Sequence, residues 1–198
     1  DCTLAGADVS GAFASARLNV PGDIERDPDA AFSGDGNFFF VDRSHATTSY
    51  IKYANFSATG VDFDGDASPD VGPMQVAKFI SVTDGYVTGV AAYDDPTLPS
   101  RSDWVCYSQG TGGNMATTAQ NVICTTRDQL STFRVGRASI PSVSPLHRGR
   151  RQLNEEQEGV AANQATLSSP YGLAFDSEGN LYIADYLSHS IKMVKKWW

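Results

Sequence analysis

Apolar residues in this chain occur in short runs of four to eight residues that are rich in aromatic and β-branched side chains. Glycine, aspartate, asparagine or proline bounds each run, which is the pattern of strands separated by turns. The runs that predict strands are residues 37–41, 75–82, 86–92, 104–107, 121–126, 132–136, 171–175, 180–184 and 190–194. Short strands at this spacing predict an all-β protein, with a sandwich, a barrel or a propeller as the candidate architectures.

Residues 139–164 differ in composition from the rest of the chain. They contain two prolines, a basic run at Arg148, Arg150 and Arg151, and an acidic run that ends at Glu158. We expect a linker or a long surface loop here. It divides the chain into a β-rich region at 1–138 and a C-terminal unit at 165–198. The arginines have the spacing of a dibasic processing site, although a solvated linker is the plainer interpretation.

The C-terminal unit has the order strand, Gly-Asn turn, strand, polar loop, strand. Each strand of such a meander has an apolar face, so the unit needs neighbours to cover it. Its residues are Ala165-Thr-Leu-Ser-Ser-Pro-Tyr-Gly-Leu-Ala-Phe-Asp176, then Gly179-Asn-Leu-Tyr-Ile-Ala-Asp185, then His189-Ser-Ile-Lys-Met-Val194.

A weaker copy of this unit lies at residues 16–53. An acidic insertion interrupts it, and it lacks the Pro-x-Gly spacing of the C-terminal unit. Its parallel positions are Ala16, Leu18 and Pro21 for Ala165, Leu167 and Pro170; Gly36-Asn37 through Asp42 for Gly179-Asn180 through Asp185; and His45, Ile51 and Lys52 for His189, Ile191 and Lys192.

These motifs resemble the NHL repeat, and the C-terminal unit resembles it closely. Each repeat of that family is one blade of a β-propeller, so the resemblance implies a β-propeller-like fold with NHL-type blades. Blades take about 40–45 residues and rings need about four to eight of them, so this chain has room for about four. We see no motif match at 75–136. We therefore expect an incomplete propeller, or part of a longer chain.

The aromatic pair Trp197-Trp198 lies at the end of the C-terminal unit. Large aromatic side chains are normally covered, and an open propeller leaves strand edges unpaired. We therefore expect protein partners or self-association through these features, with a compact monomer whose missing blades are unrecognised as the alternative.

The segment Asp62-Phe-Asp-Gly-Asp-Ala-Ser-Pro-Asp70 is the one candidate site with a definite chemistry. Carboxylates at loop positions 1, 3, 5 and 9 can curl around a cation, and the backbone carbonyl of position 7 can add an oxygen ligand. The segment resembles the FG-GAP calcium loop, whereas Pro73 stands where an EF-hand needs glutamate. We expect Ca²⁺, with an acidic turn that binds nothing as the alternative. The candidate ligands are Asp62, Asp64, Asp66, Ser68 and Asp70.

Three cysteines occur, at positions 2, 106 and 124. Cys106 and Cys124 lie in apolar runs on either side of a glycine-rich turn, so we expect a disulfide between them, with two buried thiols as the alternative. Cys2 is left over. The sequon at Asn55 is a candidate glycosylation site. A disulfide and a glycan both fit an extracellular or cell-surface protein.

The net charge of −8 opposes binding to phosphate backbones and anionic lipid, so we expect no nucleic-acid partner. No apolar run approaches the ~20 residues that span a bilayer, so we expect no membrane insertion. We see no catalytic motif and expect a non-catalytic interaction or structural module. The alternative is a propeller metalloenzyme that resembles the peptidyl-hydroxyglycine amidating lyase or a related lactonase. That lyase uses zinc-binding histidines, and this chain has only His45 and His189, at the histidine position of the repeat, and His147, in the linker.

Overall fold

A computed structural model of the chain describes residues 11–12, 18–28, 36–43, 48–83, 86–99, 103–110, 120–136 and 160–197. These residues form three antiparallel β-sheets with two short 3₁₀ helices, which confirms the all-β prediction. Every predicted run overlaps a strand. Most of the linker prediction, together with Cys2, His45, His147, the arginines at 148–151 and Trp198, lies outside the described residues.

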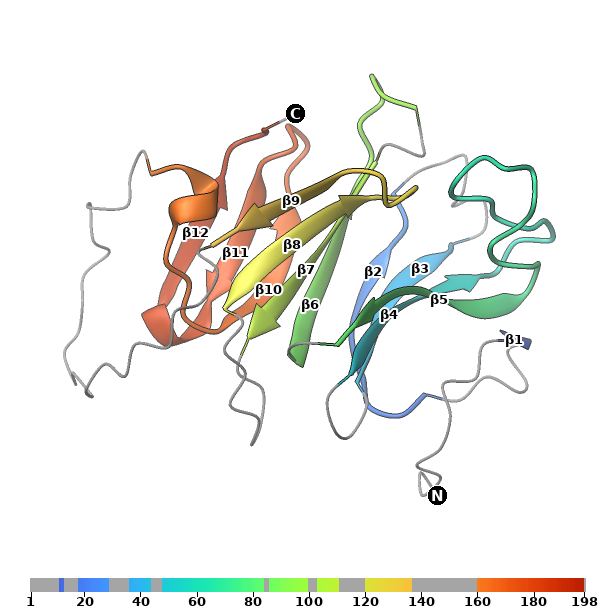
Figure 1. The fold of residues 1–198 in the computed structure, drawn as a ribbon, viewed down its shortest axis with the longest axis horizontal. Helices are drawn as coiled ribbons and strands as arrows, with labels where there is room; N and C mark the ends of the chain where they lie inside the picture. The colour runs from blue at the N-terminus through green and yellow to red at the C-terminus, as the bar shows by residue number, and fades with distance from the viewer. Residues whose placement is uncertain are drawn as a thin grey trace.

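We name the sheets by their position in the chain (Figure 1). The N-terminal sheet has the order β1-β5-β4-β3-β2, with β1 at Gly11–Ala12, β2 at Pro21–Arg26, β3 at Phe38–Arg43, β4 at Ser49–Asn55 and β5 at Gln75–Val82. The middle sheet has the order β6-β7-β8-β9, with β6 at Tyr86–Tyr93, β7 at Trp104–Gly110, β8 at Asn121–Thr126 and β9 at Thr132–Val135. The C-terminal sheet has the order β10-β11-β12, at Pro170–Phe175, Leu181–Asp185 and Ser190–Val194. The 3₁₀ helices are η3 at Ala162–Gln164 and η4 at Tyr186–Ser188.

The middle sheet lies between the other two and packs on both of its faces (Figure 1). One core joins the N-terminal and middle sheets, with Phe39, Val41, Ile51 and Tyr53 facing Val87, Val90, Val105 and Tyr107. The second core joins the middle and C-terminal sheets, with Cys106, Val122, Cys124 and Val135 facing Leu181 and Ile183. Burial of apolar area in these two layers is the main term that stabilises the stack.

The N-terminal and C-terminal sheets share one strand register. In the first pairing of each sheet a bulge follows the opening proline, between Pro21 and Ile24 in β2 and between Pro170 and Leu173 in β10. Each proline pairs with an aspartate of the following strand. That strand then pairs with its next neighbour at equivalent residues in the two sheets. The matching partners are Pro21 with Asp42, Phe40 with Lys52, Pro170 with Asp185, and Ile183 with Lys192. The repetition seen in the sequence is therefore present in the backbone.

Each of these two sheets contains the same aspartate–lysine ion pair. The Asp42 carboxylate lies 2.8 Å from the Lys52 ammonium, and both side chains are almost fully buried. Asp185 forms the equivalent pair with Lys192. Each aspartate also accepts backbone N–H groups from the segment that leads into the first strand, which fixes that segment to the second strand. The donors are Asn19 and Val20 for Asp42, and Ser168 for Asp185.

A buried arginine joins the N-terminal and middle sheets. Arg127 follows β8 and forms two hydrogen bonds with the carboxylate of Asp27, which follows β2. The Tyr53 hydroxyl donates to the same carboxylate at 2.7 Å, and the Asp103 carboxylate lies 3.5 Å from the Arg127 Nε. The guanidinium lies 5.4 Å from the centre of the Phe39 ring. This network satisfies charges that would otherwise be costly to bury.

The backbone of β6, at the edge of the middle sheet, forms polar contacts with side chains of β2 and β3. The Arg43 Nε donates to the Val87 carbonyl at 2.8 Å, and its guanidinium lies 4.6 Å from the centre of the Tyr86 ring. The Asp23 carboxylate accepts the Val90 N–H at 3.1 Å. These contacts satisfy backbone groups at the sheet junction.

The middle and C-terminal sheets approach closely at β6, β7 and β10. The Thr88 hydroxyl donates to the Pro170 carbonyl at 2.7 Å, and the Ser108 hydroxyl donates to the Tyr171 carbonyl at 2.6 Å. A Cβ atom on Gly89 would lie 2.2 Å from the same Tyr171 carbonyl oxygen. Glycine at this position therefore permits the contact.

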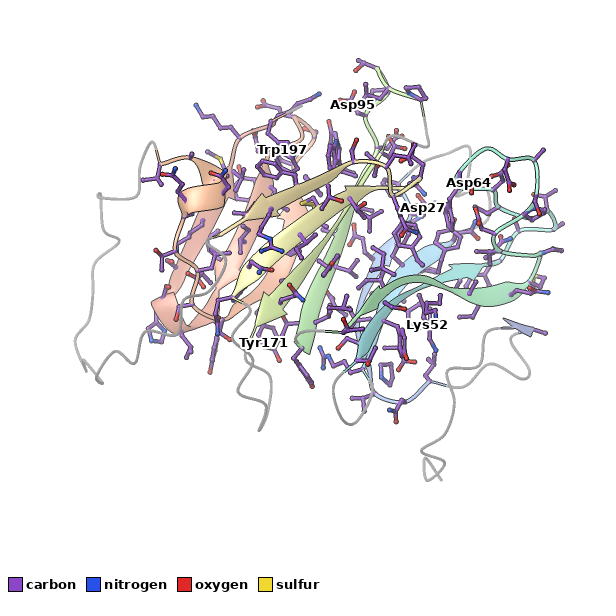
Figure 2. The ribbon with its side chains drawn as sticks, in the orientation of Figure 1. Asp27, Lys52, Asp64, Asp95, Tyr171 and Trp197 are labelled. Carbon is purple, nitrogen blue, oxygen red and sulfur yellow. A yellow bond between two sulfur atoms is a disulfide. The ribbon has the colours of Figure 1, made fainter. Side chains whose placement is uncertain are left out.

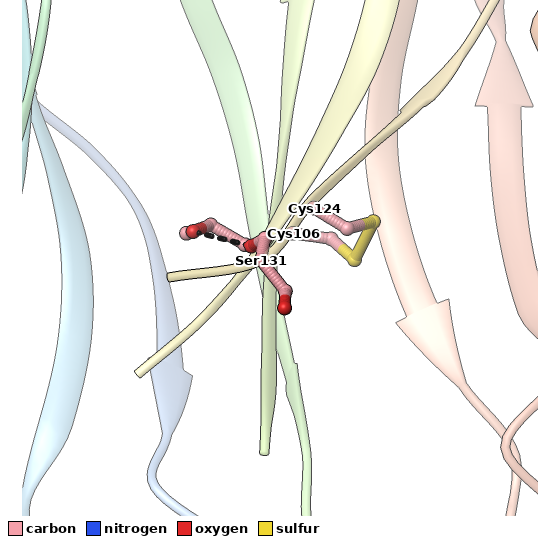
Figure 3. Close-up of a disulfide and its surroundings, with 4 residues drawn as sticks. Cys106, Cys124 and Ser131 are labelled. Carbon is pink, nitrogen blue, oxygen red and sulfur yellow. Dashed lines mark hydrogen bonds between the residues drawn. A yellow bond between two sulfur atoms is a disulfide. The ribbon is translucent and has the colours of Figure 1, made fainter. Parts of the chain in front are cut away.

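Cys106 and Cys124 form a disulfide between directly paired residues of β7 and β8 (Figure 3). Both cysteines are fully buried in the second core, which confirms the predicted pairing. Beside them the Thr125 hydroxyl donates to the Ser131 carbonyl at 3.0 Å. The bridge closes a loop across the segment that joins the two strands.

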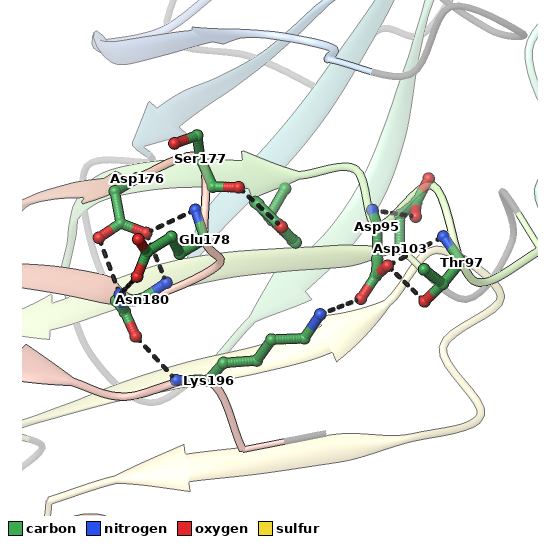
Figure 4. A network of polar contacts seen from close by, with 9 residues as sticks. Asp95, Thr97, Asp103, Asp176, Ser177, Glu178, Asn180 and Lys196 are labelled. Atoms are coloured by element: carbon green, nitrogen blue, oxygen red, sulfur yellow. Dashed lines mark hydrogen bonds and ion pairs between the residues drawn. The ribbon is translucent and has the colours of Figure 1, made fainter.

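The C-terminal segment after β12 folds back on the middle sheet. Trp197 stacks on Phe133 with ring centres 4.6 Å apart and meets Trp104 edge-on at 5.6 Å. These contacts leave Trp197 half-buried against its own chain, and association with a partner through this end of the chain stays a prediction. The adjacent Lys196 donates from its ammonium to Asp95 at 2.6 Å and from its backbone to Asn180 at 3.2 Å (Figure 4).

Candidate calcium site

The acidic loop at 62–70 connects β4 to β5 at the outer end of the N-terminal sheet (Figure 2). Val61 and Val71 close its base with two backbone hydrogen bonds, of 2.8 and 3.0 Å. Phe63 is buried in the first core, where its ring packs edge-on against Tyr53 and Phe79 at 5.0 and 5.1 Å. The loop is therefore fixed at its base while its carboxylates stay at the surface.

Carboxylates of the loop accept hydrogen bonds from its own backbone. Asp62 accepts the N–H groups of Gly65 and Ala67 at 2.6 and 2.9 Å, and Asp70 accepts the Phe63 N–H at 2.7 Å. These bonds draw the loop into a curl, and the Gly65 N–H, followed by that of Ala67, holds the pKa of Asp62 below its usual range.

Three of the four predicted carboxylates come together. Asp62, Asp64 and Asp70 each place an oxygen within 4.8 Å of the others, with Asp62 half-buried and the other two exposed. Oxygens on opposite sides of a calcium ion lie about 4.6–5.2 Å apart, because each Ca–O distance is about 2.3–2.6 Å. Carboxylate oxygens grouped this closely could together hold a hard cation that takes oxygen ligands, such as Ca²⁺.

Asp66 and Ser68 are not in this trio. The Asp66 carboxylate instead accepts the Ser68 N–H at 2.7 Å, across the exposed tip of the loop. The predicted set is thus split into three grouped carboxylates and a polar tip.

Asn55 has a structural role that the sequence did not reveal. Its side chain is fully buried, and its amide nitrogen donates to the carbonyls of Thr59 and Gly72 at 2.8 and 3.0 Å. Its amide oxygen accepts the Ser57 hydroxyl at 2.6 Å. Asn55 therefore ties the two ends of the loop region together. A glycan on its amide nitrogen would have to displace these hydrogen bonds.

His189 is exposed and lies at the end of η4, where its backbone N–H donates to the Tyr186 carbonyl at 3.1 Å. Within the described ranges the trio of aspartates is the one group of three or more candidate metal ligands, and His189 is not part of it.

Comparison with models of known protein families finds none that matches this chain, and a search of curated proteins also finds no match. In the part of the chain that the structure describes, no helix has the length and apolar character to cross a membrane.

Proposed function

We propose that this chain is an extracellular, non-catalytic interaction module built from propeller-type blades, with a structural calcium ion in the loop at 62–70. The proposal rests on one observation: the grouped carboxylates all belong to a single exposed loop, and the base of that loop is fixed in the core. An ion held this way stiffens a surface loop. A catalytic ion needs an accessible position among ligands that converge on a substrate.

The propeller part of the proposal rests on how the three sheets are arranged. One edge strand of each sheet lies at the junctions between sheets: β6 contacts both β2 and β10, and each sheet extends outward from its strand of this group. Blades that surround a central channel have this arrangement. The shared register and the repeated aspartate–lysine pair support blades of the NHL type.

The extracellular part rests on redox chemistry and composition. A buried cross-strand disulfide persists in oxidising compartments, and free Ca²⁺ at extracellular levels suits a weak loop site. The acidic surface fits the same environment, since it favours divalent cations over anionic partners.

Calcium-dependent thermal unfolding tests the proposal. Ca²⁺ should raise the melting temperature of the chain relative to a chelator, because an ion that binds only the folded loop adds its binding free energy to stability. Asp64→Asn and Asp70→Asn should each remove most of that rise. Asp66→Asn should remove less of it, since this carboxylate lies outside the trio.

Glu178→Gln is the matched control, because it removes an exposed acidic charge in the turn between β10 and β11. It should leave the calcium-dependent rise unchanged. The same melting temperature with calcium and with chelator in the parent chain would overturn the calcium proposal.

A further inference from the structure

The side chain of Asn55 uses all of its hydrogen-bonding groups inside the folded chain. A side-chain amide has one nitrogen with two hydrogens, and one oxygen. The Asn55 nitrogen donates to the carbonyls of Thr59 and Gly72 at 2.8 and 3.0 Å. The Asn55 oxygen accepts the N–H and the hydroxyl of Ser57 at 2.9 and 2.6 Å. Because the residue is also 0% exposed, its nitrogen is closed to any reagent from solution.

The rest of the sequon is fixed to the same sheet. Asn55 is the last residue of β4 and pairs with Gln75 of β5. The Phe56 N–H donates to the buried side chain of Asn37 at 2.7 Å. The Ser57 hydroxyl, which the sequon requires, is bonded to the Asn55 oxygen. Glycosylation acceptors are surface loops that an enzyme can reach, whereas this sequon is held at the end of a paired strand.

The two carbonyls that accept the Asn55 N–H groups lie at opposite ends of the segment that connects β4 to β5. Between them, Val61 and Val71 pair through two backbone hydrogen bonds, of 2.8 and 3.0 Å. The Asn55 amide therefore joins the two sides of this segment at their base. We call the contacts of the Asn55 nitrogen with Thr59 and Gly72 the Asn55 latch.

N-glycosylation needs the same nitrogen that the latch uses. Transfer of an oligosaccharide from a lipid-linked diphosphate donor forms a bond between the Asn55 Nδ2 and the anomeric carbon of the first sugar. The bond from that carbon to the diphosphate breaks, the diphosphate leaves with its lipid, and the amide nitrogen loses one proton. The modified nitrogen keeps a single hydrogen, so it can donate to Thr59 or to Gly72 but not to both. A sugar is also far larger than the hydrogen that it replaces in this fully buried site. A glycan on Asn55 and the closed latch therefore exclude each other.

We propose that folding closes the sequon at Asn55, so that the folded chain carries this asparagine unmodified and a glycan is attached only while the latch is open. The inference rests on the extracellular part of the proposed function, since secreted chains meet the transferring enzyme, and it is independent of the calcium site. The two acceptors of the latch lie only 4 and 17 residues after Asn55. A β-hairpin forms in about 1–10 μs, whereas a growing chain gains about 5–20 residues per second. The latch therefore has time to close during synthesis.

Glycan occupancy in a secretory host tests the proposal. The chain is expressed behind a cleavable secretion signal in cultured animal cells, and the tryptic peptide of residues 53–78 is measured by mass spectrometry. Asn55 of the secreted parent should be almost entirely unmodified. A synthetic peptide of residues 53–78 should accept a glycan from membranes of the same cells, because it has the sequon without the sheet. A secreted parent that is fully glycosylated overturns the proposal. A peptide that accepts no glycan also overturns it, since the sequence rather than the fold would then prevent modification.

Gly60→Ala opens the latch without changing the sequon, because a Cβ atom on Gly60 would lie 2.5 Å from the Cβ of Pro69 on the other side of the segment. It should raise the glycosylated fraction at Asn55 several-fold. Gly89→Ala is the matched control, since it introduces a similar clash, with the Tyr171 carbonyl oxygen, at the junction of the middle and C-terminal sheets. It should leave the occupancy as low as in the parent. Equal occupancy in the two variants overturns the link between the latch and the modification.

Glycan-free protein made in bacteria measures the latch itself. Asn55→Asp keeps an oxygen for Ser57 but replaces the donating nitrogen, so it should lower the melting temperature by roughly 5 °C or more. Ser57→Ala also destroys the sequon but keeps both N–H donations, so it should lower the melting temperature far less. Equal losses in the two variants overturn the latch. These measurements are made with chelator and the secretion signal is supplied, so they do not depend on the proposed calcium ion or on the natural location of the chain. The calcium-dependent rise in melting temperature tests the proposed ion alone.

Discussion

Arg127 is the residue on which the junction of the N-terminal and middle sheets most depends. Its partner Asp27 lies a hundred residues earlier in the chain, so no local pattern of the sequence predicts the pair. The strands that surround them decide the pairing, because a fully buried guanidinium needs a carboxylate within reach. The two buried aspartate–lysine pairs differ in this respect. They occupy parallel positions in the sequence repeat, so the repeat marks the residues without revealing their contact.

Tyr53 should make the stability of the chain sensitive to alkaline pH. Burial, followed by the charge of Asp27, raises the pKa of Tyr53 above its usual value of 10.0. A raised folded-state pKa adds stability that is complete below pH 10 and is lost as pH rises further, because the unfolded phenol ionises first. The free energy of unfolding of the parent should therefore fall more steeply above about pH 10 than that of Tyr53→Phe.

Urea unfolding of both chains at about pH 8 and about pH 11 measures this difference. At the lower pH Tyr53→Phe should cost about 1–3 kcal/mol, since Asp27 loses a hydrogen bond in a buried site. Equal losses of stability between the two pH values in both chains would contradict the assigned role of Tyr53.

At the scale of the strands, the pattern of apolar runs predicts most of the fold. The bounds of β5, β8 and β12 match the predicted ranges, and other runs differ by a few residues. The predicted ranges omit β1, the largely buried strand β4 at Ser49–Asn55, and β2. The residues of β2, Pro21–Arg26, are mostly polar and exposed. Its strand conformation depends on pairing with β3 and on the contact of Asp23 with Val90 in the middle sheet. Such tertiary contacts override weak local preference.

The sequence likewise predicts only part of the candidate calcium loop, because tertiary contacts determine the rest. Alternating aspartates, with a glycine at position 4, predict a curled acidic loop, and the structure places Asp62, Asp64 and Asp70 together. The sequence does not show that Asp66 is turned toward the tip or that Asn55 ties the base of the loop. Those details depend on the Val61–Val71 pairing and on burial of Phe63, which are set by the sheet below.

Gly89 should be intolerant of any side chain. A Cβ atom there would lie 2.2 Å from the Tyr171 carbonyl oxygen, which is backbone and cannot rotate away. Gly89→Ala should therefore lower the free energy of unfolding by about 1–3 kcal/mol, as for other overpacked contacts. Gly172→Ala is the matched control, because its nearest atom would be the Ala184 Cβ at an ordinary 3.8 Å. Chemical denaturation of both variants gives the comparison, and equal stability of the two would contradict the close approach of β10 to the middle sheet.

At the scale of the whole molecule, the middle sheet is the element that both cores share. It is covered on its two faces and carries the disulfide, whereas each outer sheet packs one face against it. The N-terminal sheet has a further small buried cluster, made of Phe40, Ala54 and Val76. The C-terminal sheet has three strands, and the N-terminal sheet has five. The C-terminal sheet therefore buries the least apolar surface of the three, and we expect it to have the lowest free energy of local opening.

Hydrogen exchange measured by mass spectrometry tests this order of stability. Amides of β10, β11 and β12 should exchange sooner than those of β3, β4, β6 and β7, because opening the C-terminal sheet exposes only the second core. Exchange of β11 as slow as that of β4 would show that the sheets open together. The stack would then behave as a single cooperative unit despite its two separate cores.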